Sequence, residues 1–318
     1  MEKLRIGILG CADIAKRLVI PDIKKLDQFE LVAVASRSPE KANDFAARFD
    51  CLAIHGYEKL ILRDDIDCVY IPLPNGLHHE WMIKSLEYGK HILAEKPFTE
   101  SYAKTKEIID LANTKKRCVY ENFMFTHHSQ FEFVFKLIQS GEIGEIRLFR
   151  SSFGFPEINK TNNIRYKKSL AGGALLDAGA YTVKAASFFL GMDMEVVGSD
   201  LNMFNNEVDF QGSAMLRNKN GVVAQIAFGF DNFYQNTIEI WGSKGKITLS
   251  RAFTAREGFM PGITLEKQNE KTEILLPPDN QMKKILLDFS QSIKSDYSKE
   301  FKNILLQSKL LTDIINNA

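Results

Sequence analysis

The sequence predicts a two-domain α/β protein, in which a parallel, doubly wound sheet is followed by an α+β domain with an open, mostly antiparallel sheet. The chain has 318 residues, a length that ordinarily divides into two domains. In the first part, short apolar runs alternate with helical patterns, which is typical of a parallel sheet with crossover helices. Later strand-like segments follow one another with turn signals between them. We therefore predict domains at residues 1–122 and 123–318.

The first domain is expected to contain strands that are apolar throughout, because both faces of such a sheet are covered by helices. These strands are predicted at 4–9, 29–37, 68–74, 91–97 and 116–124. The helices between them are predicted at 12–26, 38–49, 78–89 and 101–116. Pro21 interrupts the first helix, whereas Ser38 and Pro39 are typical of an N-cap and a first helical position.

The second domain begins with an alternating strand and a helix rich in small residues, at 145–155 and 172–191. Strands that look antiparallel follow at 208–218, 222–231, 236–242 and 246–253. Asn220-Gly221 and Lys244-Gly245 are hairpin signals between them. Two helices, at 279–294 and 298–316, are predicted to complete this domain.

Charge and composition exclude several classes of partner. The 41 basic and 40 acidic residues give a net charge of +1, so no strong field favours nucleic acid or an anionic membrane. No apolar run approaches the roughly 18–20 residues of a membrane span. The four cysteines form no C-x-x-C pair and are typical of free thiols in a reducing compartment. We expect a cytoplasmic protein without a signal segment.

The turn after the first strand is a candidate dinucleotide site. A glycine, Gly10, permits the tight turn, and small residues at Ala12 and Ala15 permit close approach of a pyrophosphate and close helix packing. The following helix start would offer N–H donors to phosphate. Because alanine replaces glycine twice, a tight turn without a ligand is the alternative. The predicted contacts of this turn are Gly10, Cys11, Ala12, Asp13 and Ile14.

The end of the second strand indicates which dinucleotide is preferred. An NAD site usually has an Asp or Glu there to bind the ribose 2′-hydroxyl, but this strand ends at Ser36-Arg37. Arg37 could stack on adenine and pair with a 2′-phosphate, and Ser36 could donate a hydrogen bond. We therefore expect NADP(H), with NAD(H) as a possible substitute. A solvated arginine at a strand end is the alternative.

Several strands are expected to bring polar residues to one edge of the first sheet. Ligands bind beyond the carboxyl ends of parallel strands, where the segments 73–79, 95–97 and 120–123 are predicted to lie. Singly, these residues have plainer explanations: a solvated lysine at a strand end, or histidines that begin a helix. The predicted cofactor contacts at this edge are Leu73, Pro74, Asn75, His78, Glu95, Lys96, Pro97 and Asn122.

In the second domain, Asp177 and Tyr181 stand four residues apart, which places both on one face of a helix. The glycines and alanines around them would let another backbone or a ligand come close. A tightly packed helix whose tyrosine makes a core hydrogen bond is the alternative. The six histidines show no H-E-x-x-H or similar spacing, so no metal site is predicted.

Together these motifs resemble the glucose–fructose oxidoreductase / inositol dehydrogenase (Gfo/Idh/MocA) family, in order along nearly the whole chain. The resemblance is carried by Gly10-Cys11-Ala12-x-Ile14-Ala15, Glu95-Lys96-Pro97 and Gly172-Gly173-Ala174-x-x-Asp177-x-Gly179-x-Tyr181. It implies a Rossmann domain followed by an open-sheet domain. It also implies that Lys96 lies beside nicotinamide and substrate, with a cis bond before Pro97.

One branch of the family is the most similar. Many members have histidine where this sequence has Tyr181, whereas the stretches 121–131, 164–181 and 250–254 look most like nucleotide-sugar 3-ketoreductases. The resemblance thus implies an NAD(P)-dependent oxidoreductase acting on CH–OH groups, here a dTDP-3-keto-deoxysugar 3-ketoreductase. The alternatives are a dehydrogenase of a free sugar or a trans-dihydrodiol on the same fold, and a non-catalytic NADP-binding sensor.

The expected reaction assigns a role to each candidate residue. A protonated Lys96 would stabilise the developing alkoxide and lower the pKa of Tyr181, which is ordinarily about 10, so that Tyr181 can donate the proton. Asp177 would bind a sugar hydroxyl or hold Lys96. Arg165 would pair with a diphosphate, unless it is merely a solvated loop charge. The predicted substrate contacts are Arg165, Tyr166, Asp177 and Tyr181.

The open sheet is the predicted surface for self-association. The segment 222–230 has apolar residues in both registers, so we expect both faces of that strand to be covered. A homodimer or homotetramer is expected, with a sugar or nucleotide sugar as the small-molecule partner.

Overall fold

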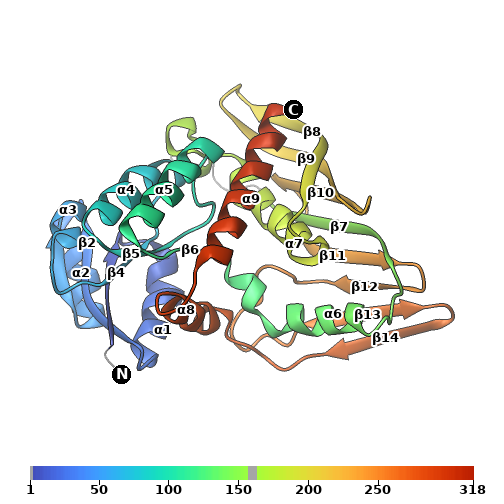
Figure 1. Cartoon of the computed structure of the whole chain (residues 1–318), viewed down its shortest axis with the longest axis horizontal. Coiled ribbons are helices and arrows are strands. Elements are labelled where there is room, and N and C mark those ends of the chain that lie inside the picture. Colours follow the sequence, from blue (N-terminus) through green and yellow to red (C-terminus); the bar gives the residue numbers. More distant parts are fainter. Residues whose placement is uncertain (1–2, 157–162) are drawn as a thin grey trace. The chain divides into compact units, whose positions relative to one another are not determined.

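The computed structural model describes residues 3–156 and 163–318, and it divides into two compact units. The first comprises the chain up to Asn122 together with Met282–Leu305, and the second comprises Phe123–Gln281 together with Leu306–Ala318 (Figure 1). Both predicted kinds of sheet are present, one in each unit. In the described part of the chain, no helix combines the length and the apolar character that a membrane span requires.

The first unit contains a six-stranded parallel sheet with strand order β3-β2-β1-β4-β5-β6. Its strands are β1 (Leu4–Leu9), β2 (Phe29–Ser36), β3 (Leu52–His55), β4 (Cys68–Ile71), β5 (His91–Ala94) and β6 (Val119–Glu121). Its helices are α1 (Ile20–Lys25), preceded by a π-helical turn (Ala15–Val19), α2 (Pro39–Phe49), α3 (Tyr57–Ile61), α4 (His78–Glu87) and α5 (Tyr102–Lys115). The predicted doubly wound sheet is confirmed.

Local sequence accounts for most of these elements. The residues of β4 and three of the four in β5 are buried, as the uniformly apolar pattern predicts for a sheet covered on both faces. Ser38 caps α2, because its side chain accepts a hydrogen bond from the Lys41 N–H. β3 and α3 were not predicted. β3 is a short edge strand with partly exposed residues, so it lacks the apolar run that identifies a central strand.

The second unit contains an eight-stranded sheet with order β14-β13-β12-β11-β7-β10-β9-β8. β7 and β10 are parallel and the other neighbours are antiparallel. Its strands are β7 (Ile146–Phe155), β8 (Met194–Phe204), β9 (Val208–Asn218), β10 (Val223–Phe230), β11 (Gln235–Gly242), β12 (Gly245–Leu249), β13 (Gly262–Lys267) and β14 (Glu270–Leu275). Both predicted hairpins are present, whereas β8, β13 and β14 were not predicted.

One face of this sheet carries helices, and the core of the unit lies between them and the strands (Figure 1). The helical elements are α6 (Ser129–Gln139), a π-helical turn (Leu175–Gly179), α7 (Ala180–Leu190) and the end of α9 (Ser298–Asn316). β10 shows the arrangement: Ala224, Ile226 and Phe228 are buried, while Gln225 and Ala227 are exposed. The opposite face, here called the open face, is therefore exposed along β10 in the described part of the chain.

The predicted boundary of the second domain, residues 123–318, differs from the structure in one segment. Most of α8 (Gln281–Ser292) and the start of α9 pack with the first unit. The Tyr120 hydroxyl donates a hydrogen bond of 2.5 Å to Asp288, and the Tyr120 ring packs edge-on against Phe289. The hydrogen bond joins residues 168 positions apart, which a local sequence pattern does not indicate.

Candidate functional site

The turn after β1 has the geometry that the dinucleotide motif predicts. Gly10 has a φ of 125°, and a Cβ atom at this position would lie 2.9 Å from the Leu73 side chain. Its N–H donates to the Ala35 carbonyl at 3.0 Å, which ties the turn to the end of β2. Ala15 is completely buried, so its small side chain permits close packing of the helix that follows. The turn therefore fits a pyrophosphate held by backbone groups.

The side chains of this turn interact with the protein itself. The Cys11 thiol donates to the Lys41 carbonyl at 3.5 Å, and burial raises the pKa of the Cys11 thiol. Asp13 forms an ion pair with Arg17, one turn further along the helix. Cys11 and Asp13 thus shape the turn, and backbone N–H groups are the natural phosphate donors here.

The end of β2 presents Arg37 to a concave surface. Ser36 is buried, and its hydroxyl accepts a hydrogen bond from the Ser38 N–H at 3.1 Å. Arg37 is exposed and lines a pocket together with Tyr57 and Trp81, whose rings pack edge-to-face at 5.0 Å. Burial raises the pKa of Tyr57, and the charge of Arg37 opposes this effect. The aromatic pair was missed from the sequence because its surroundings depend on the unpredicted β3 and α3.

Three neighbouring strands hold Glu95 at the carboxyl edge of the sheet. Its Oε1 atom accepts hydrogen bonds of 2.6 Å from the Tyr70 hydroxyl and from the Asn122 side-chain amide. These residues come from the ends of β4, β5 and β6, as the edge argument predicts. The bond between Lys96 and Pro97 is cis, as the family resemblance implies, and Lys96 itself is partly buried.

The structure gives His78 surroundings that the sequence did not indicate. Its side chain is completely buried, with Nε2 lying 2.8 Å from the Leu73 carbonyl and Nδ1 lying 3.0 Å from the Pro97 carbonyl. Burial lowers the pKa of His78, and these carbonyls together with Glu95 oppose that effect. The ring nitrogens thus connect the two loops that carry Leu73–Asn75 and Lys96–Pro97, so support of the predicted cofactor loops is the role that fits His78.

In the second unit, Arg165 and Asp177 form an ion pair, with 2.5 Å between Arg165 Nε and Asp177 Oδ2. Asp177 lies in the π-helical turn that precedes α7, while Arg165 lies in a short 3₁₀ turn (Ile164–Tyr166). Gly172 makes the approach of these segments possible, because a Cβ atom there would lie 2.4 Å from the Arg165 carbonyl oxygen. Two predicted substrate residues are therefore brought together.

Tyr181, near the start of α7, lies among aromatic rings. Its ring centroid is between 5.2 and 5.7 Å from those of Phe123, Phe125, Phe153 and Phe253. Such surroundings hold the ring in one place while the residue remains partly exposed. The fourth predicted substrate residue, Tyr166, is 8% exposed and packs against Phe204 and Phe230, so its ring belongs chiefly to the core.

The arrangement defines a class of protein: an enzyme-like molecule with one unit built to bind a dinucleotide and a second unit that carries a positioned tyrosine and an Asp–Arg pair. Residues 4–123 match the family model described as "Oxidoreductase family, NAD-binding Rossmann fold", and residues 131–248 match the "GFO/IDH/MocA C-terminal domain". The chain belongs to the Gfo/Idh/MocA family of oxidoreductases.

Its relatives include several sugar reductases. The chain is 43% identical over 295 residues to the dTDP-3,4-didehydro-2,6-dideoxy-alpha-D-glucose 3-reductase of Saccharopolyspora spinosa, covering 92% of this chain and 89% of the relative. It is 40% identical over 296 residues to the protein of the same name from Streptomyces violaceoruber, covering 92% and 86%. A crystal structure of a 3-ketoreductase from Actinomadura kijaniata in complex with NADP and TDP-benzene has a TM-score of 0.96 and 37% identity, covering 100% of this chain and 98% of the other.

Proposed function

We propose that this protein reduces the 3-keto group of a dTDP-linked deoxysugar with NADPH. The observation that carries the proposal is the 43% identity, over 92% of the chain, to a reductase of such a substrate. The chain also retains Lys96, Asp177 and Tyr181, the three residues that the family resemblance assigns to the reaction.

When bound, NADPH supplies the hydride, and the chain supplies position, charge and a proton. We assign stabilisation of the developing alkoxide to the Lys96 ammonium and donation of the proton to the Tyr181 hydroxyl. The aromatic rings around Tyr181 support this role because they fix the position of the donor. The hydrogen bonds to Glu95 and the contact of His78 with the Pro97 carbonyl support the role of Lys96 because they fix the segment on which it stands.

The ion pair refines the roles of Asp177 and Arg165. A guanidinium has five N–H donors, so Arg165 keeps donors for a diphosphate while its Nε atom binds Asp177. We therefore assign to Asp177 the task of orienting Arg165, in addition to binding a sugar hydroxyl. A crystal grown with dTDP should contain density for the diphosphate beside Arg165, and its absence at saturating dTDP would contradict this assignment.

The activity is tested by following NADPH absorbance with a dTDP-3-keto-deoxysugar generated in the same reaction mixture. Turnover with the nucleotide sugar is expected. Oxidation of free aldoses or trans-dihydrodiols by NADP⁺, without reduction of the nucleotide sugar, would instead identify a dehydrogenase of free substrates. Binding of NADPH without turnover of either substrate class would favour the non-catalytic sensor.

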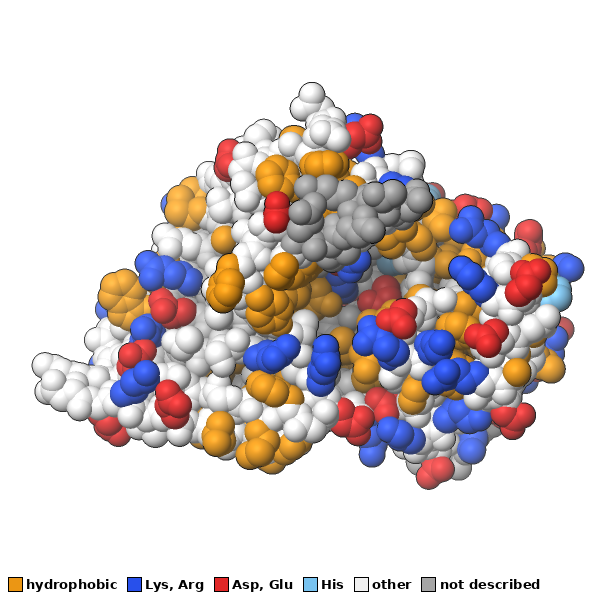
Figure 2. Space-filling model, turned by 180° about the vertical axis from the view of Figure 1, so that it is seen from behind, with side chains coloured by type: hydrophobic (Ala, Val, Ile, Leu, Met, Phe, Trp, Pro, Cys, Tyr) orange, Lys and Arg blue, Asp and Glu red, His pale blue; other side chains and the backbone are white. Residues whose placement is uncertain are grey.

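We also propose that the protein forms a homodimer or homotetramer through the open face of the second sheet. Trp241 on β11 is 51% exposed and Met215 on β9 is 40% exposed. Figure 2, which views the molecule from behind relative to Figure 1, displays hydrophobic side chains interspersed with charged ones. On the open face, Leu148, Met215, Val223 and Trp241 line one shallow hollow, and apolar side chains gathered in this way are typical of an interface between copies.

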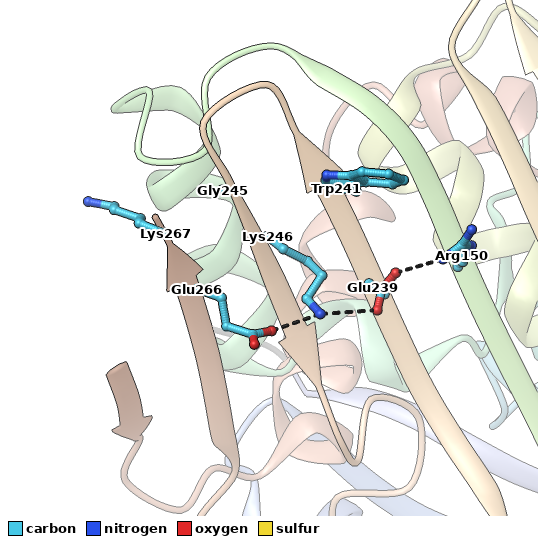
Figure 3. A pocket seen from close by; sticks show the side chains of 7 residues that line it. All are labelled: Arg150, Glu239, Trp241, Gly245, Lys246, Glu266 and Lys267. Atoms are coloured by element: carbon cyan, nitrogen blue, oxygen red, sulfur yellow. Dashed lines mark hydrogen bonds and ion pairs between the residues drawn. The ribbon is translucent and has the colours of Figure 1, made fainter. Parts of the chain in front are cut away.

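The charges on this face favour a second copy as the partner. A row of alternating sign runs across β7, β11, β12 and β13 (Figure 3). Arg150 Nη1 lies 3.2 Å from Glu239 Oε1. Lys246 Nζ lies 3.6 Å from Glu239 Oε2 and 2.8 Å from Glu266 Oε2. An alternating row can pair with itself across a two-fold axis, because each charge can face one of opposite sign.

Self-association is tested by light scattering on the wild type and on Trp241→Glu and Met215→Glu. Both variants should shift the wild-type oligomer toward a monomer, whereas Leu62→Glu, at an equally exposed position in the first unit, should not. A monomeric wild type at micromolar concentration would contradict the proposal.

The free cysteines support a location in a reducing compartment, and we propose the cytoplasm.

A further inference from the structure

A carboxylate that the predicted mechanism does not use lies against the start of the site helix in the second unit. Asp209, on β9, is partly buried. Its Oδ2 atom accepts a hydrogen bond of 2.6 Å from the backbone N–H of Leu175. Leu175 is the first residue of the π-helical turn that contains Asp177 and leads into α7, where Tyr181 stands.

The other carboxylate oxygen of Asp209 contacts the turn just before this helix. Gly173 has a φ of 116°, and a Cβ atom on it would lie 2.3 Å from Asp209 Oδ1. The Gly173 N–H donates to the Arg165 carbonyl at 2.8 Å, and the Arg165 side chain binds Asp177. The glycine pair of the family motif thus has a physical reason here: it lets a carboxylate of β9 and the backbone of Arg165 approach the helix start together.

The environment of Asp209 opposes its negative charge. Burial raises the pKa of Asp209 to about 6, although the N–H groups of Ala174 and Leu175 act in the opposite direction. A carboxylate at a helix start is ordinarily stabilising, whereas the surroundings of Asp209 disfavour its ionised form. Groups with perturbed ionisation are found most often at functional sites.

We propose that Asp209 is a positioning residue, which holds the start of the site helix so that Asp177 and Tyr181 face the substrate. The inference rests on the proposed reductase function. Its effect on the reaction is indirect, because Asp209 contacts backbone groups of Ala174 and Leu175 and leaves the chemistry to other side chains.

The test compares Asp209→Ala and Asp209→Asn with wild type and with Glu207→Gln, which removes one negative charge from an exposed residue nearby. Asp209→Ala should lower kcat about 10–100-fold, since a displacement of about 1 Å at a reacting group costs that much. Asp209→Asn keeps one carbonyl oxygen for the Leu175 N–H and should recover part of the loss. Glu207→Gln should be active, and the Kd for NADPH, whose predicted turn lies in the first unit, should change less than twofold in every variant.

A second substitution disrupts the same contact from the helix side. Gly173→Ala should lower kcat by at least a similar factor, because the added Cβ would displace the Asp209 carboxylate and because alanine is strained at a φ of 116°. Combined with Asp209→Ala, it should cost less than the product of the two single effects, since the contact with Asp209 is then already lost. Multiplicative effects would contradict the shared role. So would a kcat within twofold of wild type for Asp209→Ala, or a loss of NADPH binding parallel to the loss of kcat.

Hydrogen exchange separates this inference from the proposed function. Wild-type protein that fails to reduce the nucleotide sugar would contradict the proposed function alone. Exchange in residues 174–181 should be at least tenfold faster in Asp209→Ala than in wild type, with the first unit unchanged. Unchanged exchange in that segment would overturn the role of Asp209 whatever the substrate proves to be.

Discussion

The role that we infer for Lys96 depends on the residues that surround it. By itself, a lysine after an apolar strand is most simply a solvated charge. Its neighbour Glu95 is held by Tyr70 and Asn122, and the Pro97 carbonyl lies 3.0 Å from His78 Nδ1. The residues on both sides of Lys96 are thus held by other groups, which suits the catalytic role that we propose for Lys96.

Replacing Lys96 by alanine should lower kcat about 10²–10⁴-fold, the range typical of one positioned acid or electrostatic group. The melting temperature should change little, because the ammonium of a partly buried lysine contributes little to the core. Steady-state NADPH oxidation and thermal unfolding measure the two effects. Lys106→Ala, at an exposed lysine paired with Asp110, is the control and should retain activity. A Lys96→Ala variant with wild-type kcat would contradict the assigned role.

Arg37→Ala should raise the KM for NADPH about 10–100-fold and leave the KM for NADH nearly unchanged. The reason is the loss of charge-assisted hydrogen bonds to the 2′-phosphate, each worth about 1.5–3 kcal/mol. Measuring the KM for NADPH and the KM for NADH gives the ratio that defines the cofactor preference. Arg48→Ala, at an exposed position on α2, should leave this ratio unchanged. Equal increases in both KM values would assign Arg37 to adenine alone.

The raised pKa of Asp209 makes a prediction about stability and pH. A folded pKa of about 6, above the ordinary value of 3.8, means that the folded state binds this proton more tightly than the unfolded state. The contribution of Asp209 to stability is therefore greatest below pH 4 and is lost as the pH rises through 6. The difference in unfolding free energy between wild type and Asp209→Asn should change by about 2–3 kcal/mol over that interval. Urea denaturation at several pH values measures it, and a constant difference would contradict the shift.

At the level of secondary structure, helices and strands with a strong apolar pattern were predicted from the sequence, and those defined by tertiary contacts were not. β4 and β5 were evident because nearly all their residues are buried. β14 escaped prediction because its residues alternate between exposed and half-exposed, so it lacks an apolar face. The π-helical turns before α1 and α7 were expected as ordinary helix, since the spacing of apolar residues does not distinguish i+5 from i+4 hydrogen bonding.

The attachment of α8 to β6 gives a prediction at this scale. Tyr120→Phe removes the hydroxyl that donates to Asp288 and leaves that carboxylate with one partner fewer. The free energy of unfolding should fall by about 1.5–3 kcal/mol, the usual value of a hydrogen bond to a charged group. Chemical denaturation measures the change. Tyr88→Phe, at a tyrosine that is 46% exposed, should have almost no effect, and equal effects of the two changes would contradict the assigned contact.

For the whole molecule, the sequence was sufficient for both kinds of sheet and for the order in which they occur. The residues at the ends of β4, β5 and β6 were also correctly expected to converge, because parallel strands share one carboxyl edge. The segment Met282–Leu305 could not be assigned correctly, since an amphipathic helix does not reveal which core it covers. Asp209 was missed for the same reason: a single aspartate in a strand gives no indication of the helix it contacts.

A fragment that ends at residue 122 should therefore fail to fold. It would lack Phe301 and Ile304, which are 4% and 0% exposed and belong to the core of the first unit. Circular dichroism and denaturant titration of the fragment should reveal no cooperative transition, whereas addition of a 282–305 segment through a flexible linker should restore one. Cooperative unfolding of the fragment alone would contradict this dependence.

The discontinuity of the first unit also affects the protein during its synthesis. A nascent chain usually folds its N-terminal unit first, while later residues are still being added. Here the ribosome must synthesise all of residues 123–281 before it reaches the segment that completes the core of the first unit. The dinucleotide unit, although it is translated first, is therefore among the last parts of the nascent polypeptide to become stable. Chaperones that bind exposed apolar segments would have to cover the residues of β4 and β5 throughout that interval.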